Sequence, residues 1–226
     1  MELELRNIKK SYRKKQVLKK VSLTAKVGEC TGIIGANGCG KSTLLKILAG
    51  IEKADGGDIF MNGELVKMKS SRLTDHVGYI PQESVLIPEL TVEDNLKLWA
   101  SFGEHKKNEN TLKRLREQFQ LEDFYRKKVK YLSGGMNKRV NIVCALIHEP
   151  SLLLMDEPST ALDLVFKKEL REYIRNFTAS GGSVLLSSHD EGEIAGCTAL
   201  WAIKDGIAQK VPQGETIDKI VSKYMK

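Results

Sequence analysis

The sequence predicts an α/β fold in which a mixed sheet carries an antiparallel β subdomain near its N-terminus and an inserted α-helical subdomain. Three observations predict this fold. A short apolar run at 31–34 leads into a glycine-rich loop and a helix-like run at 43–49. A second apolar run at 152–155 ends in two carboxylates, as a central parallel strand does at its carboxyl end. Between about 90 and 150 no strand-like run occurs, and the pattern is helical.

The N-terminal part of the chain is expected to be mostly β-structure. Residues 2–8 alternate between apolar and polar side chains, as a half-buried strand does. A basic turn that contains Tyr12 follows. Asn62-Gly63 predicts a hairpin turn, and Pro81 ends a strand that leaves Gln82 at its tip. The further strands are expected at 17–18, 21–23, 59–66 and 77–80.

The middle of the chain is expected to be helical. Thr91, with Asp94 three residues later, predicts a capped helix start, and 108–121 has an amphipathic pattern. The helix at 136–148 is expected to bury one apolar stripe, and the polar residues off that stripe are Asn137, Lys138, Arg139 and Asn141. The last elements are expected to be a helix at 164–178, a strand at 184–188, a hairpin at 200–208 and a helix at 217–224.

Composition and length indicate one globular domain spanning residues 1–226. Its catalytic α/β core with the β subdomain is expected at 1–88 and 150–226, and the helical subdomain at about 89–149. Hydrophobic residues make up 41% and charged residues 29%, as in ordinary soluble domains. Because no apolar run approaches the ~20 residues that span a bilayer and the start lacks signal-peptide character, we expect a cytoplasmic protein.

The net charge of +7 is compatible with an anionic nucleotide, an anionic membrane surface, nucleic acid, or lysines that only keep the protein soluble. Charge alone does not decide among these partners. The four cysteines are scattered and form no Cys-x-x-Cys pair. This spacing argues against a zinc site or a disulfide framework.

The glycine-rich loop has the pattern G-x-x-x-x-G-K-S between a strand and a helix, which is typical of a phosphate-binding loop. In such a loop glycines let backbone N–H groups surround an anion, the helix N-terminus adds partial positive charge, and a lysine reaches the terminal phosphates. A serine hydroxyl is left for Mg²⁺. The alternative is a turn that merely joins strand to helix. The loop comprises Gly35, Ala36, Asn37, Gly38, Cys39, Gly40, Lys41, Ser42 and Thr43.

Polar side chains also follow the apolar strands at the same edge of the predicted sheet, where open α/β sheets bind ligands. Asp156 and Glu157 end one strand, Gln82 follows another, and His189 follows a third. Neighbouring residues on a strand point in opposite directions, so the two carboxylates are expected to differ in role. Asp156 would support Mg²⁺, and Glu157 would face an attacking water. The alternatives are a charged strand exit without chemistry and a structural histidine.

A second potential anion site is the Ser133-Gly134-Gly135 segment at the start of the 136–148 helix. Alone it is a weak signal, because a serine cap with two glycines is also common loop chemistry.

Together these segments resemble the ATP-binding subunit of an ABC transporter along nearly the whole chain, which implies a P-loop NTPase core. Tyr12 lies where this family carries an aromatic residue that stacks on adenine. In the family's terms the motifs are a Walker A loop at 35–43, a Q-loop at 79–82, a signature at 132–136, Walker B with its following acid at 152–157, a D-loop at 159–163 and an H-loop at 188–190.

The resemblance implies that ATP and Mg²⁺ bind between two chains in a head-to-tail dimer, expected to be a homodimer. Lys41 would neutralise phosphates, and Glu157 would act as general base on water. Ser42, Gln82 and Asp156 would arrange the metal, and His189 would contact the γ-phosphate. Ser133, Gly134, Gly135 and Asp163 would complete the facing site of the second chain.

The resemblance also implies a separate transmembrane permease subunit and a location at the inner face of the cell membrane. The signature's fifth residue, usually Gln, is Met136 here, and a basic pair follows it. This departure and the 88–92 stretch are similar to bacterial exporters of drugs, antibiotics, lipids or polysaccharides. The alternative is a soluble ABC-type ATPase for cofactor assembly or nucleic-acid work, although no nucleic-acid partner is expected.

Overall fold

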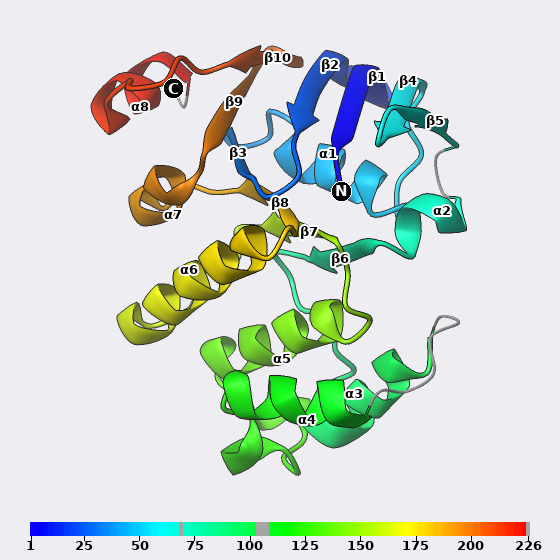
Figure 1. Cartoon of the computed structure of the whole chain (residues 1–226), viewed down its shortest axis with the longest axis vertical. Coiled ribbons are helices and arrows are strands. Elements are labelled where there is room, and N and C mark those ends of the chain that lie inside the picture. The colour runs from blue at the N-terminus through cyan, green and yellow to red at the C-terminus, as the bar shows by residue number, and fades with distance from the viewer. Residues whose placement is uncertain (68–69, 103–108, 225–226) are drawn as a thin grey trace.

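The computed structural model describes residues 1–67, 70–102 and 109–224. Its described strands form one sheet in the order β5-β4-β1-β2-β10-β9-β3-β8-β7-β6 (Figure 1). The strands are β1 (Leu3–Tyr12), β2 (Lys15–Ala25), β3 (Cys30–Ile34), β4 (Gly56–Met61), β5 (Glu64–Val66), β6 (Val77–Ile80), β7 (Leu152–Asp156), β8 (Ser183–Ser187), β9 (Ala199–Lys204) and β10 (Ile207–Lys210).

The sheet is mixed, as predicted. Strands β3, β8, β7 and β6 run parallel to their neighbours, and β9 runs parallel to β3 but antiparallel to β10. Strands β1, β2, β4 and β5 form the expected antiparallel part. The single pair Ile207–Lys20 between β10 and β2 joins the two parts. The predicted hairpin turns at Asn62-Gly63 and Asp205-Gly206 are confirmed, and all four residues have positive φ.

The described helices are α1 (Lys41–Leu48), α2 (Ser71–Thr74), α3 (Val92–Ala100), α4 (Glu109–Gln118), α5 (Gly134–Leu146), α6 (Leu164–Ala179), α7 (Glu191–Gly196) and α8 (Ile217–Tyr224), with short 3₁₀ turns at Glu122–Phe124 and Val129–Tyr131. The short helices α2 and α7 were not predicted. The predicted helix at 108–121 is α4, and residue 108 lies outside the described residues. As predicted, the Thr91 side chain accepts a hydrogen bond from the Asp94 amide and caps α3.

Two predictions near the N-terminus differ from the structure. The short runs at 17–18 and 21–23 belong to one strand, β2, because its pairing with β1 continues through several register shifts. Tyr12 ends β1 rather than lying in the turn, since it still pairs with Lys15.

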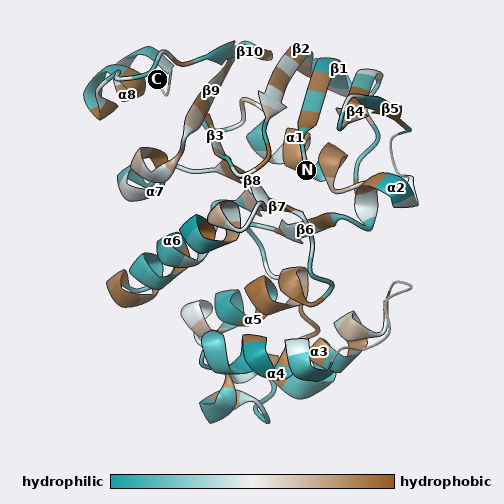
Figure 2. Ribbon diagram, viewed as in Figure 1, coloured by the Kyte–Doolittle hydropathy of each residue, from teal (hydrophilic) through white to brown (hydrophobic). Residues whose placement is uncertain are grey.

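The parallel strands separate two apolar cores. Leu152 and Leu154 of β7 share one core with α1 and the antiparallel strands. Leu153 and Met155, which point the opposite way, share the other core with α3, α5 and α6. Figure 2 shows α1 largely in the hydrophobic colour and α4 largely in the hydrophilic one. The alternation decides on which side of the sheet each residue beyond β7 lies.

Helices α3, α4 and α5 lie together at one end of the molecule, away from the antiparallel strands (Figure 1). Between residues 90 and 150 the described chain contains no strand, in agreement with the sequence pattern. None of the described helices is long and apolar enough to cross a bilayer.

Candidate functional site

The loop between β3 and α1 depends on glycine at two positions. Gly35 has φ of 149°, and a Cβ there would lie 2.4 Å from the Ile203 carbonyl oxygen. Gly40 has φ of 113°, and its Cβ would lie 2.6 Å from a methyl carbon of Leu18. Both backbones are left-handed and tightly packed, so a side chain is excluded. No side chain caps the N-terminus of α1, whose first amides stay available to an anion.

Lys41 lies within this loop with only 6% of its surface exposed. Its Nζ donates hydrogen bonds to the Gly35 carbonyl oxygen at 2.8 Å and the Ala36 carbonyl oxygen at 3.2 Å. These bonds fold the lysine over the loop and place its positive charge beside the start of α1.

A hollow of about 470 Å³ opens beside the loop and brings many of the predicted residues together. The predicted residues Gly35, Ala36 and Cys39 do not line it, and Cys39 instead packs against the core on the α1 side. Because β1, β6, β7 and β8 all end here, residues far apart in the sequence meet at one sheet edge. The lining residues are Tyr12, Val17, Asn37, Gly38, Gly40, Lys41, Ser42, Thr43, Gln82, Glu157 and His189.

Glu157 has a polar neighbour on each side within this hollow. Gln82 Nε2 donates a hydrogen bond to Glu157 Oε2 at 3.0 Å, and His189 Nε2 lies 3.6 Å from Glu157 Oε1. The backbone of Glu157 has φ of 46°, and its amide donates to the Ser187 carbonyl oxygen at 3.0 Å. Burial, together with the positive charge of Lys41, lowers the pKa of His189, and the Glu157 carboxylate partly opposes this shift. At neutral pH the imidazole is therefore uncharged.

Asp156 has different surroundings from Glu157, as the alternation of side chains along the strand predicts. It is 2% exposed, does not line the hollow, and its Oδ1 accepts a hydrogen bond of 2.5 Å from Ser187 Oγ. Since Leu152 and Leu154 face α1, Asp156 lies on the same side of β7 as the helix that begins at Lys41 and Ser42.

Ser133, Gly134, Gly135 and Asp163 do not line the hollow at the loop. Ser133 caps α5 by accepting a hydrogen bond from the Met136 amide, and Asp163 caps α6 by accepting one from Phe166. A Cβ on Gly134 would lie 3.2 Å from the Ala161 Cβ. The signature segment thus lies beside the loop that ends at Asp163 and apart from the hollow at the loop between β3 and α1.

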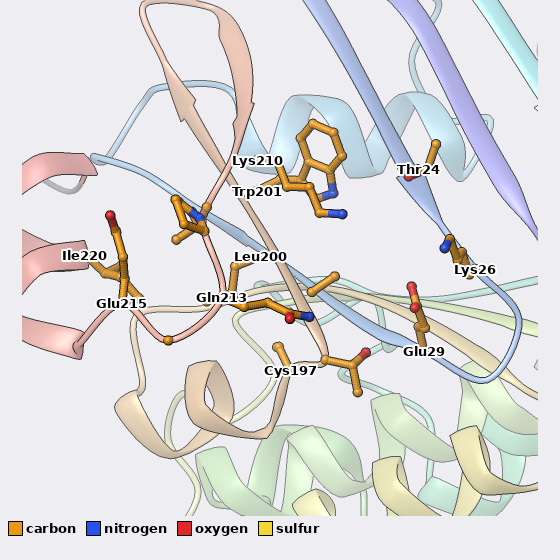
Figure 3. A pocket seen from close by; sticks show the side chains of 15 residues that line it. Thr24, Lys26, Glu29, Cys197, Leu200, Trp201, Lys210, Gln213, Glu215 and Ile220 are labelled. Carbon is orange, nitrogen blue, oxygen red and sulfur yellow. The ribbon is translucent and has the colours of Figure 1, made fainter.

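Another hollow, of about 410 Å³, lies between the end of β2, β9 and the segment before α8 (Figure 3). Its lining includes Lys26, Glu29, Cys197, Trp201 and Glu215, and it includes none of the residues that the sequence singled out.

Several residues that shape the site were not predicted. Ser187 fixes Asp156, and the Ser188 hydroxyl, next to His189, donates a hydrogen bond to buried Glu193. Lys138 and Asn141 lie off the apolar stripe of α5 as predicted, but both are buried. Helical periodicity alone did not reveal this burial, because their partners lie on the distant segment at 81–85.

Several known proteins are similar to this chain. Residues 18–160 match the family model described as ABC transporter. The chain is 34% identical to the linearmycin resistance ATP-binding protein LnrL of Bacillus subtilis, over 85% of this chain and 62% of that protein. It is 36% identical to a Nod factor export ATP-binding protein I of Burkholderia orbicola, over 94% of this chain and 70% of that protein. The chain thus spans roughly two thirds of the length of these relatives.

Solved structures give the same assignment. The structure of an ATP-binding subunit of an ABC transporter aligns with a TM-score of 0.83 and 31% identity, over 99% of this chain and 93% of that one. A dimeric ATP-binding cassette in a post-hydrolysis state with ADP and Pi aligns with a TM-score of 0.82 and 27% identity, over 93% and 99% of the two chains. The chain belongs to the ABC transporter family and has the fold of its ATP-binding cassettes.

Proposed function

We propose that this chain binds ATP with Mg²⁺ and hydrolyses it in a head-to-tail homodimer that powers export through a separate membrane subunit. The observation that carries the proposal is the hollow beside the loop, where a phosphate cradle, an aromatic ring, a held carboxylate and an amide converge.

The loop fits a polyphosphate. Gly35 and Gly40 leave no room for side chains, and the uncapped start of α1 offers backbone N–H groups to phosphate oxygens. Lys41 supplies the neutralising charge. Tyr12, at the rim of the hollow and 40% exposed, offers its ring face to an adenine base.

The residues proposed as metal ligands carry oxygen donors, which Mg²⁺ prefers. Ser42 contributes a hydroxyl, Gln82 an amide oxygen, and Asp156 a carboxylate that Ser187 orients. No group of three or more His, Cys, Asp or Glu in the described ranges is placed to hold a metal alone. The ion would therefore share its coordination with phosphate oxygens and would polarise them for attack.

Glu157 is placed to take a proton from the attacking water. Gln82 donates a hydrogen bond to one of its carboxylate oxygens, and His189 lies beside the other within the same hollow. A neutral His189 is able to donate a hydrogen bond to the terminal phosphate.

A second chain would complete the site. Each chain carries two helix-terminal anion features, at α1 and at α5, which do not share a hollow. One triphosphate satisfies both features only if the α5 segment comes from another molecule. Ser133, Gly134, Gly135 and Asp163 are proposed for this facing half, and the dimeric form of a similar cassette supports it.

The export role rests on the relatives, one of which is named for Nod factor export and another for linearmycin resistance. We place the membrane contact on the helical subdomain at about 89–149 and on the loop after Gln82, where Val85 and Ile87 are exposed apolar side chains. The core would then comprise 1–88 and 150–226. In this arrangement the protein lies peripherally on the inner face of the membrane.

The test is Mg²⁺-dependent release of phosphate from ATP by the purified chain, together with affinity capture from membranes. Turnover that Glu157→Gln abolishes, with co-purification of a multi-span membrane protein, supports the proposal. Turnover with only non-membrane partners would favour a soluble ATPase. Absence of Mg²⁺-dependent turnover in the captured complex would contradict it.

A further inference from the structure

Lys138 is a buried cation in the first half of α5, directly after the signature segment. It is 6% exposed, and its Nζ donates a hydrogen bond of 2.8 Å to the Pro81 carbonyl oxygen. Burial lowers the pKa of Lys138 to about 8, and the nearby carboxylates of Asp156, Glu193 and Glu157 oppose the shift.

This lysine is part of a set of buried polar contacts that fasten the segment at 81–87 to the helices. Asn141 of α5 accepts a hydrogen bond from the Val85 amide and donates one to Ser84 Oγ at 3.1 Å. Asn95 of α3 exchanges two hydrogen bonds with the backbone of Ile87. Lys138 makes the contact nearest to Gln82.

Stability alone does not explain a charge at this position. Within 4.0 Å Lys138 forms no ion pair with any residue that the structure describes. A buried ammonium without an ion-pair partner loses its hydration, and apolar residues of similar volume are often as good or better for folding. Its one fixed contact is to the residue before Gln82, whose amide in turn holds Glu157.

We propose that Lys138 is a positioning residue for ATP hydrolysis, whose hydrogen bond to the Pro81 carbonyl holds the Gln82 amide on Glu157. The inference rests on the proposed function. It makes α5 the link between the signature segment at its N-terminus and the general base. The helix that would bind a phosphate of the facing site also sets the geometry of hydrolysis in its own chain.

The first experiment compares steady-state ATP hydrolysis by Lys138→Met, Lys138→Gln and the matched control Lys97→Met. Lys97 is an exposed lysine on α3 that pairs with Glu93. Because small displacements of catalytic groups are costly, Lys138→Met should lower kcat on the order of tenfold, with KM for ATP little changed. Lys138→Gln keeps an N–H donor and should recover part of the loss, whereas the control should match the parent chain.

Thermal unfolding distinguishes a role of Lys138 in positioning Gln82 from a role in packing. Removing the buried charge should leave the unfolding temperature of Lys138→Met equal or higher. If both Lys138 variants unfold at a lower temperature and lose kcat only to that extent, the inference is wrong. An unchanged kcat in well-folded Lys138→Met would also overturn it.

A double-mutant cycle tests the route through Gln82. If Lys138 acts by placing that amide, Lys138→Met should cause no further loss of kcat in a Gln82→Ala background. An equal loss in both backgrounds would contradict the inference. Failure of the proposed function gives a different result, since the parent chain would then show no turnover that Glu157→Gln abolishes.

Discussion

Gln82 and Glu157 are joined by a hydrogen bond of 3.0 Å from the amide nitrogen to the carboxylate, across the ends of two neighbouring parallel strands. The strand register explains the contact. Ile80 of β6 pairs with Met155 of β7, and Gln82 and Glu157 each stand two residues beyond that pair. One sheet register therefore fixes the relative position of two residues: the one that would contact the metal and the one that would activate water.

Glu157→Gln should reduce ATP hydrolysis by about 100-fold or more, because a general base typically contributes that much. The change keeps the size of the side chain and a hydrogen-bonding partner for Gln82, so ATP affinity should persist. Phosphate release and binding of a fluorescent ATP analogue measure the two effects. Near-normal turnover would refute the assignment of Glu157 as base.

Ser133→Arg should abolish ATP hydrolysis without weakening nucleotide binding by the single chain. Ser133 does not line the hollow at the loop, and an arginine there would block only the approach of a second molecule. Binding at low protein concentration and turnover at high concentration distinguish the two steps. Unaltered turnover would exclude a shared site.

Gly35→Ala should weaken ATP binding about tenfold or more, because the new Cβ meets the Ile203 carbonyl at a strained positive φ. Gly196→Ala is the matched control, since nothing lies within 4 Å of its Cβ and it is far from the loop in sequence. Titration with labelled nucleotide measures the ATP affinity of both variants. Equal affinity of the two variants would argue against the loop as the phosphate cradle.

The buried Lys138 predicts a particular dependence of stability on pH. Its pKa falls from 10.5 to about 8 on folding, so between these values the unfolded chain binds more protons than the folded chain. The free energy of unfolding of the parent chain should therefore rise with pH over this interval relative to Lys138→Met, by at most about 3 kcal/mol.

Urea unfolding at several pH values from about 8 to about 10 measures this difference, with exposed Lys97→Met as the control. A difference between the parent chain and Lys138→Met that is independent of pH would show that the lysine is not buried as described.

The elements predicted best are those with local signals. The glycine pattern at 35–43 gave the loop, Asn62-Gly63 and Asp205-Gly206 gave the hairpins, and Thr91 gave a helix start, because each depends on neighbouring residues. The meeting of Gln82, Glu157 and His189 was also predictable, since residues that follow parallel strands share one edge.

The features that depend on pairing between segments far apart in the sequence could not be predicted. The continuity of β2 depends on its irregular register with β1, which no short window contains. Lys138 and Asn141 have polar side chains off an apolar stripe, which is the pattern of a solvated face, yet the segment at 81–85 covers them. Likewise, buried Asp156 accepts its hydrogen bond from Ser187 on the neighbouring strand. The orientation of the Asp156 carboxylate therefore depends on the order of strands in the sheet.

We propose above that the loop at 35–43 is half of a site that a second chain completes. The direct test is analytical ultracentrifugation of Glu157→Gln with ATP, since slow hydrolysis would keep the closed state. The mass of 25.3 kDa should double in ATP, and adding Ser133→Arg should restore the single-chain mass. A chain that binds ATP yet remains at 25.3 kDa, or a dimer that persists with Ser133→Arg, would show that no second chain completes the site in this way.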